Sequence, residues 1–138
     1  MSRLHRIVLI VITAVTMAAH ATQLAADVSI SVDGDSEGPI IVSPGGTVTF
    51  QIQADGCGRA NAWRDTWTIG VNSDNATFDS SPCEDSPFTR TETFNTAGTF
   101  DVTYSSEYCN GFTWFGCVSG WRDFGSDSIQ VVVQEESQ

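Results

Sequence analysis

Apolar and polar residues alternate with a period of two in several short segments of this chain, and no segment carries a sustained helical stripe. The clearest case is residues 47–53, in which Val48, Phe50 and Ile52 point to one side of an extended chain. Further strands are expected at residues 28–32, 40–42, 63–69, 76–79, 89–94, 99–104 and 128–133. Residues 40–42 and 89–94 are short or irregular in pattern and are expected at sheet edges. The pattern predicts an all-β fold, an antiparallel sandwich of two sheets with about seven strands.

A small core follows from the inward-facing positions of these strands. The predicted core consists of Val48, Phe50, Ile52, Trp67, Phe100, Val102, Ile129 and Val131. Each buried aromatic or branched side chain contributes roughly 1.5–3 kcal/mol, so this set is sufficient if disulfides assist. A chain of 138 residues leaves room for one such domain.

The first residues have the layout of a secretory signal. Arg3 and Arg6 precede an apolar run over residues 7–17, and Ala19 and Ala21 complete an A-x-A cleavage pattern. We therefore expect a signal peptide over residues 1–21 and a single domain over residues 22–138, which is secreted, periplasmic or displayed at the cell surface. The run is shorter than the roughly 20 residues that a membrane span needs, so no membrane contact is expected after cleavage. A retained helix, serving as an anchor or as the spine of a fibre, is the alternative.

Charge and histidine usage exclude several functions. The chain has 17 acids and 6 bases with a net charge of −11, and this field repels the phosphates of nucleic acids. Lysine is absent, and both histidines, His5 and His20, lie in the predicted signal peptide, so catalysis that relies on histidine is not expected. Chemistry would depend on carboxylates alone, such as Glu84 with Asp85 in a glycoside hydrolase. We expect no enzyme.

Four cysteines lie in the predicted mature domain: Cys57, Cys83, Cys109 and Cys117. An exported chain meets an oxidising compartment, so two disulfides are expected. The spacings contain no C-x-x-C pair and the mature domain has no histidine, which argues against structural zinc.

Residues 91–104, which read TETFNTAGTFDVTY, resemble the signature of PKD-type immunoglobulin-like domains. Residues 44–50, which read PGGTVTF, are similar to the entry into the second strand of that family, and Trp67 matches its core tryptophan. The acidic turn that follows this tryptophan in the family is missing here. The resemblance covers residues 28–133 and implies an immunoglobulin-like sandwich that serves adhesion, spacing or ligand binding without catalysis.

The immunoglobulin strand order also implies that all four cysteines lie in loops at one end of the sandwich. On this basis the favoured pairs are Cys57 with Cys83 and Cys109 with Cys117. The pairing of Cys57 with Cys109 and of Cys83 with Cys117 remains open.

Aromatic residues in the same loops predict a recognition surface. The candidate ligand-binding residues are Trp63, Trp114, Phe115 and Trp121, with Arg59 and Arg122 beside them, and Phe112 lies in the same region. Sugar rings stack on indole faces and polar groups bind their hydroxyls, so a glycan or an extracellular protein is the expected partner. The alternative is that these rings turn inward and form a small satellite core under residues 107–125.

Two further possibilities come from other segments. Asp33, Asp35 and Glu37 copy the opening of an EF-hand calcium loop, but Pro44 occupies the position of the bidentate glutamate, so no cofactor is expected and calcium is only an alternative. An exposed edge strand at residues 28–32 would permit self-association by strand addition, as in a fibre or pilus subunit.

Overall fold

The computed structural model describes residues 27–135, so the predicted signal peptide at residues 1–21 lies outside the described residues. Ten strands and one helical turn make up this region, and the fold is all-β as expected. No helix within residues 27–135 has the length and apolarity to cross a membrane.

The smaller sheet contains three antiparallel strands in the order β1-β3-β6, which are β1 (Asp27–Ser31), β3 (Gly46–Asp55) and β6 (Phe88–Phe94). Side chains of β3 alternate between buried and exposed along its length. This is the alternation that Val48, Phe50 and Ile52 predict, because successive side chains of a strand point to opposite faces. The expected edge position of residues 89–94 is confirmed.

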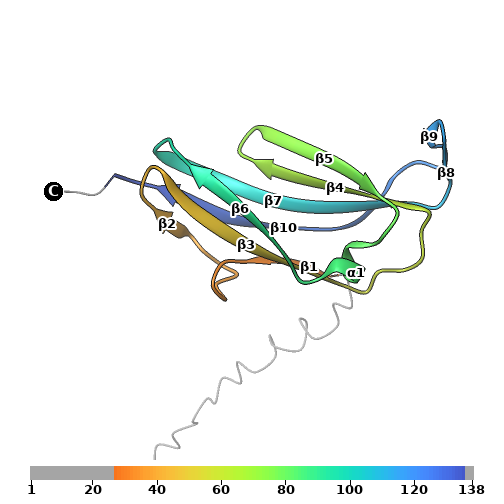
Figure 1. Ribbon diagram of the computed structural model, residues 1–138, viewed down its shortest axis with the longest axis horizontal. Helices are drawn as coiled ribbons and strands as arrows, with labels where there is room; N and C mark the ends of the chain where they lie inside the picture. The colour runs from red at the N-terminus through yellow and green to blue at the C-terminus, as the bar shows by residue number, and fades with distance from the viewer. Residues whose placement is uncertain (1–26, 136–138) are drawn as a thin grey trace, which may run out of the picture.

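The larger sheet has the order β2-β10-β7-β4-β5 (Figure 1). Its strands are β2 (Ile40–Val42), β10 (Arg122–Val133), β7 (Gly98–Cys109), β4 (Ala62–Ile69) and β5 (Asn72–Phe78). β2 runs parallel to β10, whereas the other neighbours are antiparallel. β7 and β10 are each 12 residues long and extend well beyond the segments expected from the sequence. The helical turn α1 (Pro82–Asp85) and a hairpin of β8 (Phe112–Thr113) and β9 (Gly116–Cys117) were not expected.

One hydrophobic cluster joins the inner faces of the two sheets. Phe50 of the smaller sheet meets Trp67 of the larger one edge to face, with ring centroids 5.2 Å apart. The predicted core is confirmed except for Phe100, which is only partly buried. Buried residues that the prediction missed include Ile30, Val32, Phe94, Tyr104 and Val133.

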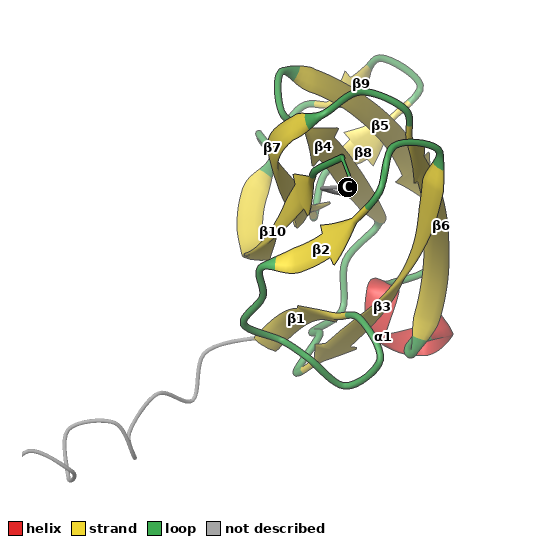
Figure 2. Cartoon of the chain, turned by 90° about the vertical axis from the view of Figure 1, so that its left-hand side faces the viewer, coloured by secondary structure: helices red, strands yellow, loops and turns green. Residues whose placement is uncertain are grey.

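The two open sides between the sheets differ. On one side lie β1, β2 and β10 (Figure 2), where β1 contacts β10 directly and the backbone N–H of Ile30 in β1 donates to the Asp127 carboxylate of β10 at 2.8 Å. A backbone donor on the free edge of β1 is thereby satisfied, and an inward-pointing charge discourages pairing with another chain. On the other side, the edges of β5 and β6 have no strand between them in the described residues.

Candidate functional site

Two disulfides brace one end of the molecule. Cys57, in the loop between β3 and β4, is bonded to Cys83 of α1, and Cys109 at the end of β7 is bonded to Cys117 of β9. The favoured pairing is confirmed. The β3–β4 loop, α1 and the β8–β9 hairpin gather at this end (Figure 1), which we call the disulfide pole.

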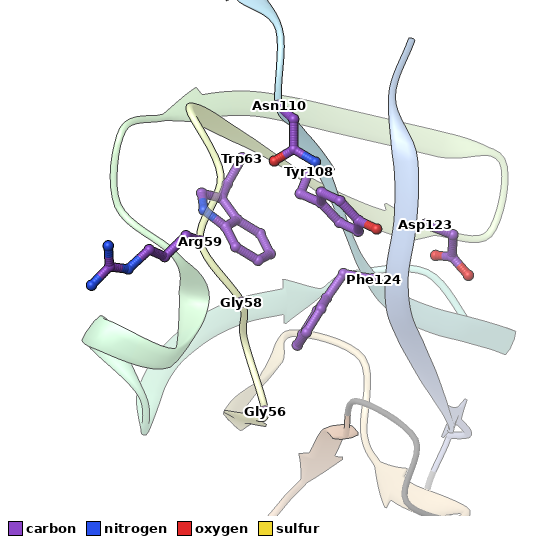
Figure 3. Close-up of a pocket in the computed structure, with 8 residues that line it drawn as sticks. All are labelled: Gly56, Gly58, Arg59, Trp63, Tyr108, Asn110, Asp123 and Phe124. Atoms are coloured by element: carbon purple, nitrogen blue, oxygen red, sulfur yellow. The ribbon is translucent and has the colours of Figure 1, made fainter. Parts of the chain in front are cut away.

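A cleft of about 390 Å³ opens at the disulfide pole. It is lined by Gly56, Gly58, Arg59, Trp63, Tyr108, Asn110, Asp123 and Phe124. The rings of Trp63, Tyr108 and Phe124 face one another around the hollow (Figure 3), with centroids 5.8 Å apart for Trp63 and Tyr108 and 5.3 Å apart for Trp63 and Phe124. Aromatic walls with few polar groups are typical of ligand pockets.

The position of Trp63 corrects the sequence prediction. Trp63 lies in β4, as the strand expected at residues 63–69 implies, and only 2% of it is exposed, so it is not part of an exposed loop surface. Residues 63 and 65 of β4 share the inner face with Trp67, since side chains two apart lie on the same side of a strand. Trp63 therefore serves the cleft as a packed wall and not as a projecting ring.

The polar groups of the cleft stand at its margin. Figure 3 shows the amide of Asn110 above the rings, while Arg59 and Asp123 carry their charged ends away from the rings on opposite sides. Arg59 and Asp123 are both exposed. A ligand with an apolar face and peripheral hydroxyl groups fits this arrangement, because rings and hydrogen-bonding groups are separated in the same way.

Trp114 and Phe115 form the tip of the β8–β9 hairpin. Their ring centroids are 3.7 Å apart, and the two residues are 87% and 75% exposed. They are the two residues that connect Thr113 to Gly116, the last pair of the hairpin. A two-residue turn has no neighbouring strand to cover it, and the Cys109–Cys117 disulfide restrains the hairpin that carries it. The tip is therefore an exposed apolar surface on a hairpin that the Cys109–Cys117 disulfide restrains.

Trp121 is an anchor of this loop and not part of its exposed tip. Its ring is partly buried, lies 6.1 Å from that of Phe112, and has the guanidinium carbon of Arg64 at 4.6 Å from its centroid. Arg64 in turn binds Glu107 at 2.8 Å. The aromatic residues therefore divide: Trp63 is buried, Trp121 is partly buried against Arg64 and Phe112, and Trp114 and Phe115 are exposed. Arg122 is exposed at the start of β10 and does not line the cleft.

Of the three acidic residues at the β1–β2 connection, Asp35 binds the backbone of the turn. The Asp35 carboxylate accepts hydrogen bonds from the N–H groups of Glu37 and Gly38, both at 2.9 Å. These bonds lower the pKa of Asp35, the Gly38 bond having the larger effect. No group of three or more acidic, cysteine or histidine side chains in the described part of the chain is arranged to hold a metal ion.

Asp65 is the carboxyl group whose environment is most unusual. It accepts a 2.7 Å hydrogen bond from the Ser106 hydroxyl, and burial raises its pKa although this bond opposes the shift. Glu84 and Asp85, the carboxylate pair considered from the sequence, are both exposed on α1.

Sequence reasoning missed Tyr108, Asn110, Asp123 and Phe124 as cleft residues. The signal for Tyr108 was present, because the alternation through Val102 and Tyr104 continues to residue 108. No comparable signal exists for Phe124, which reaches the cleft only because β10 pairs with β7 beyond the expected strand. The chain matches no protein-family model, and neither a curated relative nor a solved structure shows significant similarity to it.

Proposed function

We propose that this protein is an exported, noncatalytic immunoglobulin-like module that binds a glycan through its disulfide pole. The strand orders β1-β3-β6 and β2-β10-β7-β4-β5 support an immunoglobulin-like arrangement of the PKD type. The two disulfides and the signal-like first 21 residues support a secreted, periplasmic or cell-surface location.

The observation that carries the proposal is the exposed pair Trp114–Phe115. These large apolar rings are 87% and 75% exposed, so they gain the free energy of burial only when a partner covers them. Their loop is closed by the Cys109–Cys117 disulfide, so little conformational entropy remains to be lost on binding. A rigid aromatic platform of this kind suits the apolar face of a sugar ring.

The neighbouring cleft supports the same ligand class. The partly buried rings of Tyr108 and Phe124 offer further apolar surface, and Arg59, Asn110 and Asp123 offer donors and acceptors for hydroxyl groups. A neutral glycan avoids the repulsion that the net charge of −11 imposes on polyanions. A protein ligand is the competing partner, because aromatic residues are also common at protein interfaces.

Binding to a panel of neutral polysaccharides tests the proposal. Trp114→Ala is expected to weaken glycan binding about tenfold or more, as truncation of a central aromatic contact does. Val71→Ala is the matched control, because Val71 is 97% exposed in the β4–β5 turn, at the opposite end of β4 from the disulfide pole. The glycan proposal fails if no polysaccharide binds, or if both variants bind as the wild type does. Loss of binding to a protein partner in Trp114→Ala alone would assign the tip to protein recognition.

The alternative roles receive less support from the fold. Strand addition at the β1 edge is disfavoured, because the Asp127 carboxylate already accepts a hydrogen bond from the Ile30 N–H on that edge. A carboxylate hydrolase would need a pair of carboxyl groups across a cleft. The cleft of the disulfide pole has Asp123 alone, and the pair Asp65 and Asp85 lines a separate hollow away from the exposed aromatic tip.

A further inference from the structure

β5 presents an unprotected strand edge. It is 7 residues long, all of them exposed, and within residues 27–135 it pairs with β4 alone. It contains no proline or lysine, two residues that commonly protect an edge, and Asp74 is its only charged residue. Every second residue of such a strand directs its N–H and C=O groups away from its single neighbour. The edge therefore offers backbone donors and acceptors to an added chain.

A groove runs beside this edge between β5 and β6. It consists of three adjoining hollows of about 120, 240 and 220 Å³. The first and second share Asp65, Phe78 and Phe88, and the first and third share Trp67, Asp74 and Arg90. Since β5 extends about 20 Å, the groove matches an extended chain better than a compact molecule.

Carboxylates dominate the charge of this groove. Asp65, Asp74, Asp85 and Glu92 line it, and Arg90 is its only cation. Arg90 binds Asp74 at 3.4 Å and Glu92 at 2.8 Å. The Arg90 and Asp74 side chains are 40% and 73% exposed, and an exposed ion pair of this kind is weak. A cationic side chain entering the groove is therefore attracted to it and can replace Arg90.

Two polar atoms at the base of the groove make no hydrogen bond of good geometry. They are Trp67 Nε1 and the Tyr104 hydroxyl, both of which are buried. The Tyr104 hydroxyl lies beside the Asp65 carboxyl, and burial together with this neighbouring carboxyl raises the pKa of Tyr104. Arg90 lies over the Trp67 ring at 5.1 Å, and Phe88 lies against Tyr104 at 5.7 Å. Both covering side chains belong to β6 and are only partly buried, so movement of either one exposes unsatisfied groups.

We propose that the β5 edge and its groove form a strand-addition site for an extended basic peptide of another protein. The peptide pairs with β5 through its backbone and places lysine or arginine side chains in the groove at alternate positions. Backbone hydrogen bonds supply the affinity, and the carboxylates select the charge. This site is separate from the disulfide pole and does not depend on glycan binding there.

A second copy of this chain is a poorer occupant. The described residues hold four arginines, Arg59, Arg64, Arg90 and Arg122, and no two of them lie at alternate positions of one strand. β5 itself carries Asp74 and no cation, so a copy would add negative charge to a negative groove.

Binding is measured with a fluorescent peptide of alternating lysine and threonine. The indole N–H signal of Trp67, assigned with Trp67→Phe, is followed by NMR, because the chain has only 4 such signals. The peptide is expected to bind and to shift this signal. Asp74→Lys is expected to weaken binding by about tenfold, since the exposed side chain leaves the fold intact while its charge is reversed.

Three controls separate strand addition from general charge attraction. Asp101→Lys, at an exposed strand position outside the groove, is expected to leave binding unchanged. A peptide with glutamate in place of lysine, and a lysine peptide methylated at every second amide, are both expected not to bind. The proposal is overturned if the lysine peptide does not bind, if the methylated peptide binds equally, or if Asp74→Lys and Asp101→Lys weaken binding to the same extent. A concentration-dependent dimer abolished by Asn75→Pro would assign the edge to a second copy instead.

Discussion

Asp65 shows how a single side chain in β4 couples the fold to pH. It points toward the interior with Trp63 and Trp67, and its one good hydrogen bond comes from Ser106. Burial removes water from the carboxylate and raises its pKa from the ordinary value of 3.8, because the charged form is disfavoured there. The folded protein therefore binds this proton more tightly than the unfolded chain does.

Asp65→Asn should stabilise the protein at neutral pH. An acid whose pKa is higher in the folded protein than in the unfolded chain adds to the free energy of unfolding when the pH is below its unfolded pKa. This contribution is lost as the pH rises from 3.8 through the raised folded pKa. The amide oxygen still accepts from Ser106 but carries no charge to bury. In thermal unfolding at a series of pH values, the melting temperature of the variant should lie a few degrees above that of the wild type at pH 7. This difference in melting temperature should shrink toward zero below pH 3.8. An exposed control, Asp101→Asn, should show no such gap. A variant that is less stable than wild type at pH 7, with the difference closing below pH 3.8, would mean that the fold stabilises the charged carboxylate instead.

The tryptophans mark the limit of sequence reasoning for single residues. Trp67 was assigned to the core from its strand pattern, and this was correct. Trp63 and Trp121 were grouped with Trp114 because all three lie near the cysteine-rich loops, yet only Trp114 projects. The difference depends on contacts with residues distant in sequence, such as Phe124 against Trp63 and Arg64 against Trp121. Composition of a loop does not encode these contacts.

Among the elements, most strands were predictable, whereas the β8–β9 hairpin was not and the disulfide pole was predictable only in part. The alternation of β3 is local, so its position follows from residues 47–53 alone. The extension of β7 to Cys109 and the start of β10 at Arg122 depend on their pairing, which aligns Arg122 with Tyr108. The cleft lies between these two extensions, and for that reason its residues were largely missed.

The two disulfides should contribute unequally to stability. Cys57–Cys83 closes a separation of 26 residues and Cys109–Cys117 one of 8. Loop-closure entropy gives about 3.5 kcal/mol for the first and about 2.5 kcal/mol for the second. Denaturant unfolding of the double alanine variants should show the larger loss for Cys57→Ala with Cys83→Ala. The other pair should cost less stability but weaken binding at the tip, because it frees the hairpin of Trp114. The reverse order of stabilities would contradict the entropic account.

At the scale of the whole molecule, acidity dominates the surface. The full chain has a net charge of −11, and cleavage of the predicted signal peptide with Arg3 and Arg6 would take the net charge to −13. The described residues form three ion pairs, Arg64–Glu107, Arg90–Asp74 and Arg90–Glu92, and none is fully buried. Repulsion among the unpaired carboxylates therefore exceeds the attraction within these ion pairs, and this repulsion destabilises the folded state.

Salt should consequently stabilise the protein. Raising the ionic strength to about 0.1 M shortens the screening length to about 10 Å, which weakens repulsion between distant carboxylates more than attraction within the close ion pairs. The melting temperature should rise with sodium chloride and then level off. Tetramethylammonium chloride at equal ionic strength should reproduce the rise, because screening does not depend on the identity of the cation. A rise specific to one cation would instead indicate a bound ion. A fall in melting temperature with either salt would show that the ion pairs outweigh the repulsion, and the acidic surface would then have to be regarded as balanced by Arg64 and Arg90.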